Sequence, residues 1–284
     1  MNSSVLTLLE SKINELTAAQ KKVGDYILKY PSEAAFMTVE QISGKIDVSV
    51  ATVMRLCYGL GFSGFSQFQK ELQGLLINRV APPSRLETNI KKQRGSNLIL
   101  KCAELQINNI KKTVDFLSEE KVAQAFDLIL KAKKIYIVGD RTSGSAAAYL
   151  NEGLNRLGLD CEWFNHDSSR VQSSIAKMTP DVLVIVICLP RYSKKAVSIA
   201  KAASEKCAKI LAITDGYSSP VSNFSDVFLS CAFDSLSFHH SAIGAIFVAD
   251  VLVTGVANKN AADTKRFLEE IELVSVAIDA NVVK

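Results

Sequence analysis

Two polar segments carry the residue types that bind anions. The first runs from Gly139 to Ser145, directly after a short apolar run and at the start of a segment with helical spacing. Free backbone N–H groups at a helix start, together with Arg141 and the hydroxyls of Thr142, Ser143 and Ser145, suit a phosphate group. Turns of this kind also favour serine and threonine for capping alone, so a purely structural role of the loop stays open.

The second segment, Cys188 to Lys195, follows the most hydrophobic run of the chain. Its candidates are Arg191 and Ser193, because a guanidinium at the end of a strand can hold a phosphate or carboxylate through two parallel hydrogen bonds. The alternative is an ion pair of Arg191 with a local acid such as Asp167 or Asp215.

His239 and His240 form a third and weaker candidate, ahead of an apolar segment from Ala242 to Ala257. An imidazole there could bond a sugar hydroxyl or a phosphate, although a capping or interface role fits the sequence equally well. The three histidines and six cysteines show no C-x-x-C pair and no spacing typical of metal ligands. We therefore predict no metal, no cofactor, and six buried free thiols as in a reducing cytosol.

A different chemistry is indicated near the N-terminus, where Ser49 can cap a helix. In that helix Val50, Val53, Leu56 and Leu60 are expected to form a buried stripe. The outward positions are small and polar and are followed by an arginine, which suits close approach to base edges and phosphates in the major groove of DNA. These outward residues are Ser49, Ala51, Thr52 and Arg55.

A shorter helix precedes this one, with Val39, Ile42 and Ile46 on its apolar face and a break at Asp47. Two short helices joined by a tight turn are typical of a helix-turn-helix, but also of a plain helical hairpin. The charge distribution favours the helix-turn-helix, because residues 1–96 hold 12 Lys or Arg against 8 Asp or Glu, whereas residues 97–284 hold 21 of each. A basic excess favours a polyanionic partner.

The hydrophobic patterns divide the chain of 284 residues into two domains. Residues 1–77 show only helical spacing, residues 78–96 read as an exposed linker, and residues 97–284 alternate short apolar runs with helix-length segments. The fold class is therefore α/β with an all-α N-terminal domain. The second domain is expected to be a doubly wound parallel sheet with helices on both faces and strands at 134–139, 160–164, 182–188, 209–214 and 227–230.

Neither of the two most apolar stretches is expected to cross a membrane. The segment Val182 to Cys188 has the length of a strand, and Ala242 to Ala257 carries Asp250 in its middle. The N-terminus also lacks a basic stretch followed by an apolar one. We expect a cytoplasmic protein.

Three segments resemble the N-terminal domain of the MurR/RpiR family of bacterial transcriptional regulators, namely Val39 to Ser43, Ser49 to Cys57, and Leu60 to Phe68. The α/β region resembles a SIS (sugar isomerase) domain, which senses phosphorylated sugars or related metabolites in that family. The resemblance implies double-stranded operator DNA, a sugar phosphate or similar effector, and a second copy of the chain (dimer or tetramer) as partners. It also places Ser49, Ala51, Thr52 and Arg55 at the DNA surface.

The sequence departs from the family pattern at three places. Tyr58-Gly59 stands where the family often has a basic pair, which predicts fewer phosphate contacts and a weaker salt dependence of DNA binding. Asp47 stands where many relatives have glycine, and aspartate tolerates the left-handed conformation that the turn needs. Arg191 replaces a glycine of the usual SIS loop, so the effector cannot be copied from relatives that match better.

Three functions are compatible with these patterns. The first is a DNA-binding regulator, in our reading a repressor, whose SIS domain binds an anionic metabolite. The second is a sugar-phosphate isomerase or lyase with a basic helical appendage, for which Glu152, His239 or His240 could move protons. The third is a sensor that binds a protein instead of DNA.

Overall fold

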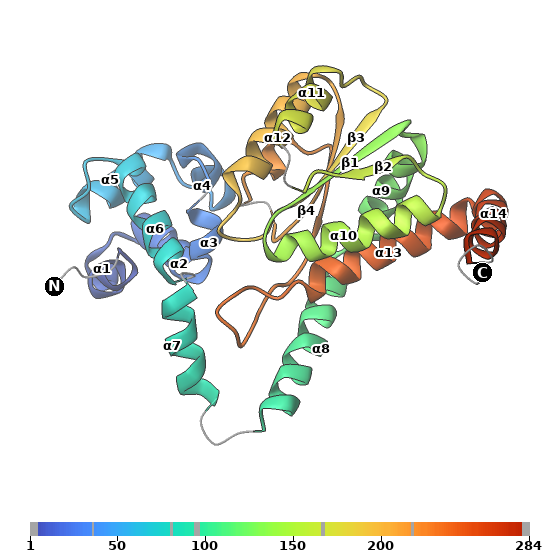
Figure 1. Cartoon of the computed structure of the whole chain (residues 1–284). Helices are drawn as coiled ribbons and strands as arrows, with labels where there is room; N and C mark the ends of the chain where they lie inside the picture. The colour runs from blue at the N-terminus through green and yellow to red at the C-terminus, as the bar shows by residue number, and fades with distance from the viewer. Residues whose placement is uncertain are drawn as a thin grey trace. The chain divides into compact units, whose positions relative to one another are not determined.

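The computed structural model describes residues 5–35, 37–79, 82–93, 97–165, 168–216 and 219–279. The chain divides into two compact units, Met1–Lys92 and Gln93–Lys284 (Figure 1). Each unit has its own buried apolar cluster.

The first unit is all-helical, as the sequence predicts. Its main core side chains are Leu9, Ile27, Ile42, Leu56 and Phe68, all of them buried. Its elements are α1 (Val5–Lys12), η1 (Ile13–Glu15), α2 (Ala18–Lys29), α3 (Pro31–Ala34), α4 (Val39–Lys45), α5 (Val50–Gly59), α6 (Phe65–Arg79) and α7 (Pro82–Gln93).

The interval predicted as a linker, residues 78–96, contains helix α7, and α6 extends into it as far as Arg79. Residues 80–81 and 94–96 of this interval lie outside the described residues. The domain limits 1–77 and 97–284 stay predictions.

The second unit is built on five parallel strands in the order β2-β1-β3-β4-β5. The strands are β1 (Lys134–Gly139), β2 (Cys161–Trp163), β3 (Val182–Ile187), β4 (Lys209–Thr214) and β5 (Val227–Ser230). All five predicted strands are present, which confirms the doubly wound sheet.

Helices cover both faces of this sheet. One buried cluster joins it to α9, α10 and α13, and another joins it to α11 and α12. The helices are α8 (Leu98–Phe116), α9 (Glu119–Lys131), α10 (Thr142–Arg156), α11 (Ser168–Ala176), α12 (Lys194–Glu205), α13 (Ile243–Lys259) and α14 (Ala261–Asp279), with η2 (Ser222–Phe224) before β5.

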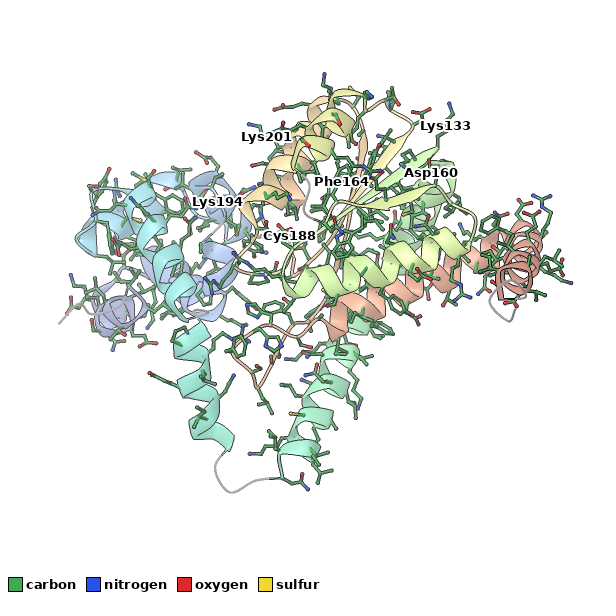
Figure 2. The ribbon with its side chains drawn as sticks, in the orientation of Figure 1. Lys133, Asp160, Phe164, Cys188, Lys194 and Lys201 are labelled. Atoms are coloured by element: carbon green, nitrogen blue, oxygen red, sulfur yellow. The ribbon has the colours of Figure 1, made fainter. Side chains whose placement is uncertain are left out.

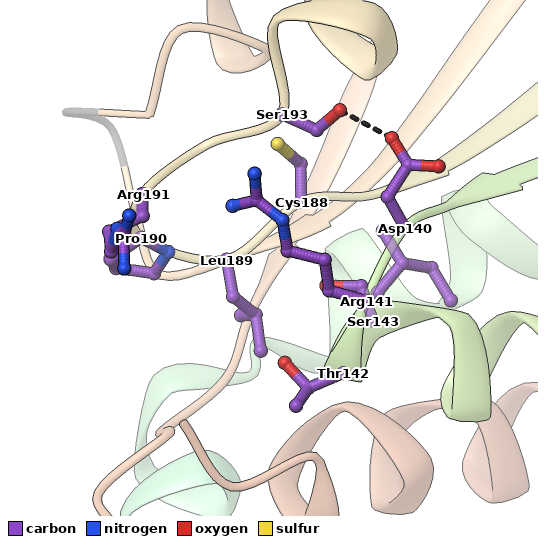
Figure 3. A pocket seen from close by; sticks show the side chains of 10 residues that line it. Asp140, Arg141, Thr142, Ser143, Cys188, Leu189, Pro190, Arg191 and Ser193 are labelled. Carbon is purple, nitrogen blue, oxygen red and sulfur yellow. Dashed lines mark hydrogen bonds between the residues drawn. The ribbon is translucent and has the colours of Figure 1, made fainter. Parts of the chain in front are cut away.

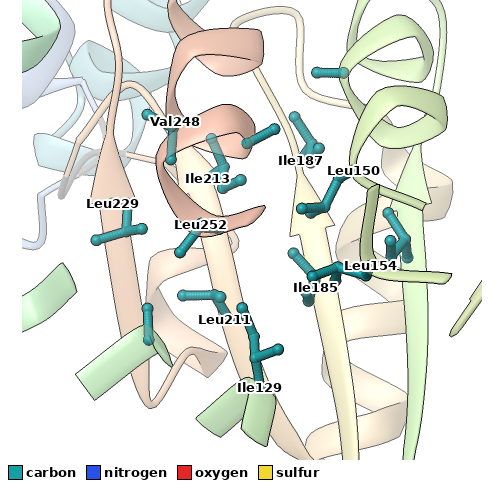
Figure 4. Close-up of a cluster of buried hydrophobic side chains, with 14 of the residues drawn as sticks. Ile129, Leu150, Leu154, Ile185, Ile187, Leu211, Ile213, Leu229, Val248 and Leu252 are labelled. Atoms are coloured by element: carbon teal, nitrogen blue, oxygen red, sulfur yellow. The ribbon is translucent and has the colours of Figure 1, made fainter. Parts of the chain in front are cut away.

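The buried core shows that the sheet is covered on both faces. Every residue of β3 is buried, as expected of a parallel strand that is covered on both faces. Figure 4 shows Ile185 and Ile213 of the sheet against Leu150, Leu154 and Leu252 of the covering helices. Burial of such side chains stabilises the unit by roughly 1.5–3 kcal/mol each.

A buried polar contact holds α8 to the loop between β5 and α13. The side-chain amide of Asn109 donates to the carbonyl of Asp234 at 2.7 Å and accepts from its N–H at 3.1 Å. Thr113 Oγ1 accepts from the N–H of Ala232 at 3.0 Å and donates to the carbonyl of Asn109 at 2.7 Å. Asn109 and Thr113 are fully buried, so helix α8 is fixed to the end of strand β5 by satisfied hydrogen bonds.

The thiols differ from the prediction in part. Cys57, Cys161, Cys188 and Cys231 are buried, but Cys102 and Cys207 are exposed. Cys102 lies near the start of α8, and Cys207 lies in the turn after α12 with a φ of 60°, so the predicted burial of all six thiols was wrong.

Among the described residues, no single helix combines the length and the apolar composition needed to span a membrane. The pair α13 and α14 passes a test of length and composition only when taken together, across a bend of 103°.

Replacing Thr113 by valine tests the α8 contact. The valine keeps the volume but leaves the buried N–H of Ala232 without its acceptor, which is expected to lower the free energy of unfolding by about 1–3 kcal/mol. Thr113→Ser is the matched control, because it keeps the hydroxyl. Urea unfolding followed by circular dichroism gives the comparison, and equal stability of the two variants would contradict the assigned role of the hydroxyl.

Candidate functional site

The two predicted anion loops lie side by side at a break in the order of the sheet. Strand β1 pairs with β2 on one side and with β3 on the other, so the chain reverses its direction of travel across the sheet between β1 and β3. Ligands of open α/β sheets bind at such a point, outside the carboxyl ends of the strands. The register aligns Gly139 with Ile187, the last residues of the two strands.

A small, open cavity lies between these loops (Figure 3). Five of the predicted effector residues line it, namely Arg141, Thr142, Ser143, Arg191 and Ser193. The remaining lining residues are Asp140, Ile187, Cys188, Leu189 and Pro190.

The loop after β1 forms a tight turn. The N–H of Ser143 donates to the carbonyl of Asp140, and Arg141 between them has a φ of 54° and a ψ of −125°, the first central position of a type II′ turn. This position favours glycine, so a side chain there is strained. Gly139 is needed for another reason, because a Cβ at that position would lie 2.8 Å from the carbonyl oxygen of Ser143.

Arg141 brings a cation into the cavity. Its side chain is exposed, and Figure 3 shows it reaching from the loop after β1 toward Cys188 and Ser193. Arg191 also has a left-handed backbone, with a φ of 62°, and is exposed. Two arginines therefore occupy conformations that favour glycine, one in each loop of the same cavity.

Ser193 joins the two loops. Its hydroxyl donates to the carboxylate of Asp140, 53 residues earlier, and accepts from the N–H of Ala196 at the start of α12. Its one proton is thus given to Asp140 and is not directed at a ligand. Asp140 was not among the predicted site residues, and only its place directly after the glycine that ends β1 pointed to it.

Asp215 does not pair with Arg191. It lies after β4 and accepts hydrogen bonds from Tyr192, at 2.9 and 3.1 Å, and from Thr214 at 3.1 Å. Burial raises the pKa of this carboxyl, and the bonds from Tyr192 oppose the shift. The other predicted partner of Arg191, Asp167, lies outside the described residues.

The opposite edge of the sheet is electrostatically different. Figure 2 places Lys133 and Asp160 there, far from Cys188 and Lys194 at the cavity end. Lys133 pairs with Asp181 at 2.7 Å, and Asp160 pairs with Lys134 at 2.6 Å. The charges at the amino-terminal edge therefore neutralise one another.

Three predicted effector residues do not line the cavity. Ser145 is exposed on α10, and its hydroxyl donates to the carbonyl of Thr142 at 2.7 Å, so it closes the first helical turn. His239 is exposed and bonds Ser237, whereas His240 is buried with its ring edge against Phe233. The role of Ser145, His239 and His240 as effector residues stays a prediction.

The helix pair of the first unit has the predicted geometry. Thr38 and Gln41 form a reciprocal cap at the start of α4, and Ser49 caps α5 by accepting from the N–H of Thr52 at 3.2 Å. Asp47 has a φ of 52° in the turn between the helices, which confirms the left-handed conformation expected of it.

The outward face of α5 is polar. Ser49, Ala51 and Arg55 are exposed and Thr52 is partly exposed. Val53 and Leu56 are fully buried, but Val50 is 38% exposed, so its place in the buried stripe was wrong. Helical side chains lean toward the N-terminus, and at the first residue of a helix no earlier turn lies beneath them.

Both units match known protein families. The helix-turn-helix domain of the rpiR family matches residues 3–79, and the SIS domain matches residues 128–254. An uncharacterised HTH-type transcriptional regulator of Bacillus subtilis, YbbH, is 26% identical over 282 residues, 95% of this chain and 96% of the relative.

The chain belongs to the RpiR family of helix-turn-helix regulators.

Solved structures share the fold. The sugar isomerase domain of an RpiR transcription factor from Sphaerobacter thermophilus is 25% identical, with a TM-score of 0.61. The match covers 62% of the present chain and 99% of the solved domain. The NanR protein of Vibrio vulnificus, solved as a complex with ManNAc-6P, covers 97% of the chain and 99% of its own length, with 22% identity and a TM-score of 0.67.

Substitution of Arg141 by glycine separates backbone strain from charge. Glycine adopts the observed φ freely, so Arg141→Gly is expected to raise the free energy of unfolding by about 1 kcal/mol, whereas Arg141→Ala keeps the strain and is expected to give no gain. Urea unfolding of the two variants beside the parent chain measures the difference. If alanine stabilised as much as glycine, the turn would not be strained.

Proposed function

We propose that this RpiR-family chain is a DNA-binding transcriptional regulator whose SIS domain binds a sugar phosphate or a related anionic metabolite. The observation that carries the effector class is the pair of arginines at the junction of β1 and β3. Arg141 and Arg191 are both exposed at one cavity, and a guanidinium binds phosphate or carboxylate oxygens in a fixed fork.

The polar face of α5 supports the DNA side of the proposal. Its first turn presents Ser49, Ala51 and Thr52, which are small enough to let the helix approach base edges, and Arg55 follows one turn later. The solvent-exposed Tyr58 follows where the family often has a basic pair, so we expect a modest salt dependence.

The kind of effector is suggested by fold as well as charge. NanR, which shares the fold over nearly the whole chain, holds the sugar phosphate ManNAc-6P. In the present chain the cavity combines Arg141 and Arg191 with the hydroxyl of Thr142, a set that suits a phosphate bearing a polyol. Effector binding is proposed to release DNA, by changing the spacing of two helix-turn-helix units that must lie about 34 Å apart on the operator.

Sugar-phosphate isomerisation is the second candidate, because the SIS fold is also found in isomerases. It requires a base beside the bound sugar. The carboxylate among the described lining residues is Asp140, and it already accepts from Ser193, whereas Glu152 and the two histidines do not line the cavity. We therefore propose a sensor without turnover, acting in the cytoplasm.

A thermal-shift screen of the full chain against sugar phosphates, amino-sugar phosphates and sugar acids tests the sensor, with each stabilising compound analysed for conversion. A compound at 100 times its dissociation constant should add about 2.7 kcal/mol to the stability. Conversion to product would replace the proposal by the isomerase reading.

Arg191→Ala is expected to abolish that stabilisation and to leave DNA affinity unchanged, since it removes one guanidinium from the cavity. Lys201→Ala on the exposed face of α12 is the control for loss of one positive charge. A full thermal shift in Arg191→Ala would place the anion elsewhere.

Arg55→Ala is expected to weaken DNA binding by roughly 5- to 150-fold, a loss of about 1–3 kcal/mol, if the arginine reads a base. Fluorescence anisotropy with mixed genomic DNA and with a selected operator duplex, each at two salt concentrations, measures this. Lys70→Ala, an exposed position on α6, is the control, and the thermal shift by effector should survive in both variants. Unchanged affinity would remove Arg55 from the DNA surface.

A further inference from the structure

Helix α8 presents an apolar seam that is left exposed by the described residues of its own unit. Leu100, Ile107 and Val114 are spaced seven residues apart and are exposed to 58%, 53% and 53%. Ala103, which is exposed, and Ile110, which is half-buried, lie three residues after the first two of them. This is the a and d pattern of a coiled coil, in which apolar residues repeat every 3.5 residues on average.

The seam lies beside the buried side of α8. Asn109 and Thr113, which hold the loop after β5, are fully buried and point to another part of the helix circumference. The helix is thus anchored along one side, and the neighbouring side exposes large aliphatic residues to water. These aliphatic side chains would be buried by a partner helix whose apolar residues repeat with the same spacing. The α8 helix of a second copy of the chain has that spacing.

The charges beside the seam decide the direction of pairing. With Leu100, Ile107 and Val114 at a, the flanking e positions are Glu104 and Lys111, both exposed. In an antiparallel pair that stacks Ala103 on Val114 and Ile107 on Ile110, Glu104 of each copy lies on the same side of the seam as Lys111 of the other, about 3 Å away along the helix axis. A parallel pair would instead set e against g, where Ile99 and Gln106 offer no opposite charge.

We propose that two copies of the chain associate through an antiparallel coiled coil of their α8 helices, with Ile107 and Ile110 at its centre. Because the rise is about 1.5 Å per residue, the two α8 starts lie about 30 Å apart along the seam. Helix α8 directly follows the segment that leads from the helix-turn-helix unit. If the proposed function holds, this separation is close to the one turn of DNA that two recognition helices must span.

The first test is the mass of the full chain by sedimentation velocity over a range of concentrations, without DNA or effector. Ile107→Asp places a charge in the central layer and is expected to weaken self-association at least about tenfold. Asn108→Asp adds the same charge one residue away, outside the seam, and should not change it. If Ile107→Asp kept the parent mass profile, or lowered thermal stability without changing mass, the seam would be covered within one chain and the proposal would fail.

A charge exchange tests the direction while leaving the apolar seam intact. Glu104→Lys and Lys111→Glu should each weaken association by roughly three- to tenfold, and the double variant should recover most of it, because the two pairs form again with reversed sign. Asp115→Lys, which reverses a charge on the outer face of α8, is the control. A double variant as weak as either single one would overturn the antiparallel arrangement.

Cross-linking gives a readout that does not depend on affinity. In a chain whose exposed Cys102 and Cys207 are replaced by serine, Ala103→Cys together with Val114→Cys should form a disulfide-linked dimer under mild oxidation. Neither substitution alone should do so, since in the antiparallel pair residue 103 faces residue 114 of the other copy and not its own counterpart. Efficient linking by Ala103→Cys alone would show a parallel pair and would overturn the proposal.

Discussion

The parallel pairing of β1 with β3 is the constraint on which the effector site depends. It ends on Gly139 beside Ile187, so the two loops leave the sheet at the same level and Asp140 can reach Ser193. A shift of one residue would turn every side chain of a strand to the other face. The burial of all of β3 makes such a shift costly, and the apolar core therefore sets the geometry of a polar site.

The cavity differs from a cradle made of backbone alone. Where a glycine would adopt the turn without strain, Arg141 and Arg191 hold a left-handed backbone and add charge. Strain of this kind persists when the surrounding structure imposes it, and it collects at binding sites. Here Gly139 packs against the start of α10, and the capped α12 follows the second loop, so both turns are held by helices.

The sequence predicted the elements better than their contacts. Continuous apolar runs predicted β1, β4 and β5 with their observed ends, because strands buried on both faces leave an unambiguous pattern. Asp47 could be predicted to take a left-handed turn, since few residues do so. The comparisons with known families confirmed the regulator and SIS assignment.

Such patterns could not predict contacts between residues that are far apart in the sequence. The hydrogen bond from Ser193 to Asp140 joins positions 53 residues apart. The turn at Arg141 has a backbone conformation that an arginine at this position does not predict. Ser145 was predicted to bind an anion, but hydroxyls at a helix start serve anions and the helix backbone alike. That its hydroxyl donates to the carbonyl of Thr142 is visible only in the structure. The exposure of Val50 depends on its place at the very end of a helix.

The distribution of the thiols makes the chain suitable for labelling. Burial raises the pKa of Cys188 in the cavity to about 12, so it remains a neutral thiol at physiological pH. Cys102 and Cys207 are exposed, each on a helical part of the second unit or directly after one. An alkylating dye would therefore attach at two surface points and leave the cavity chemically intact, which provides an optical reporter on α8 in the otherwise native chain.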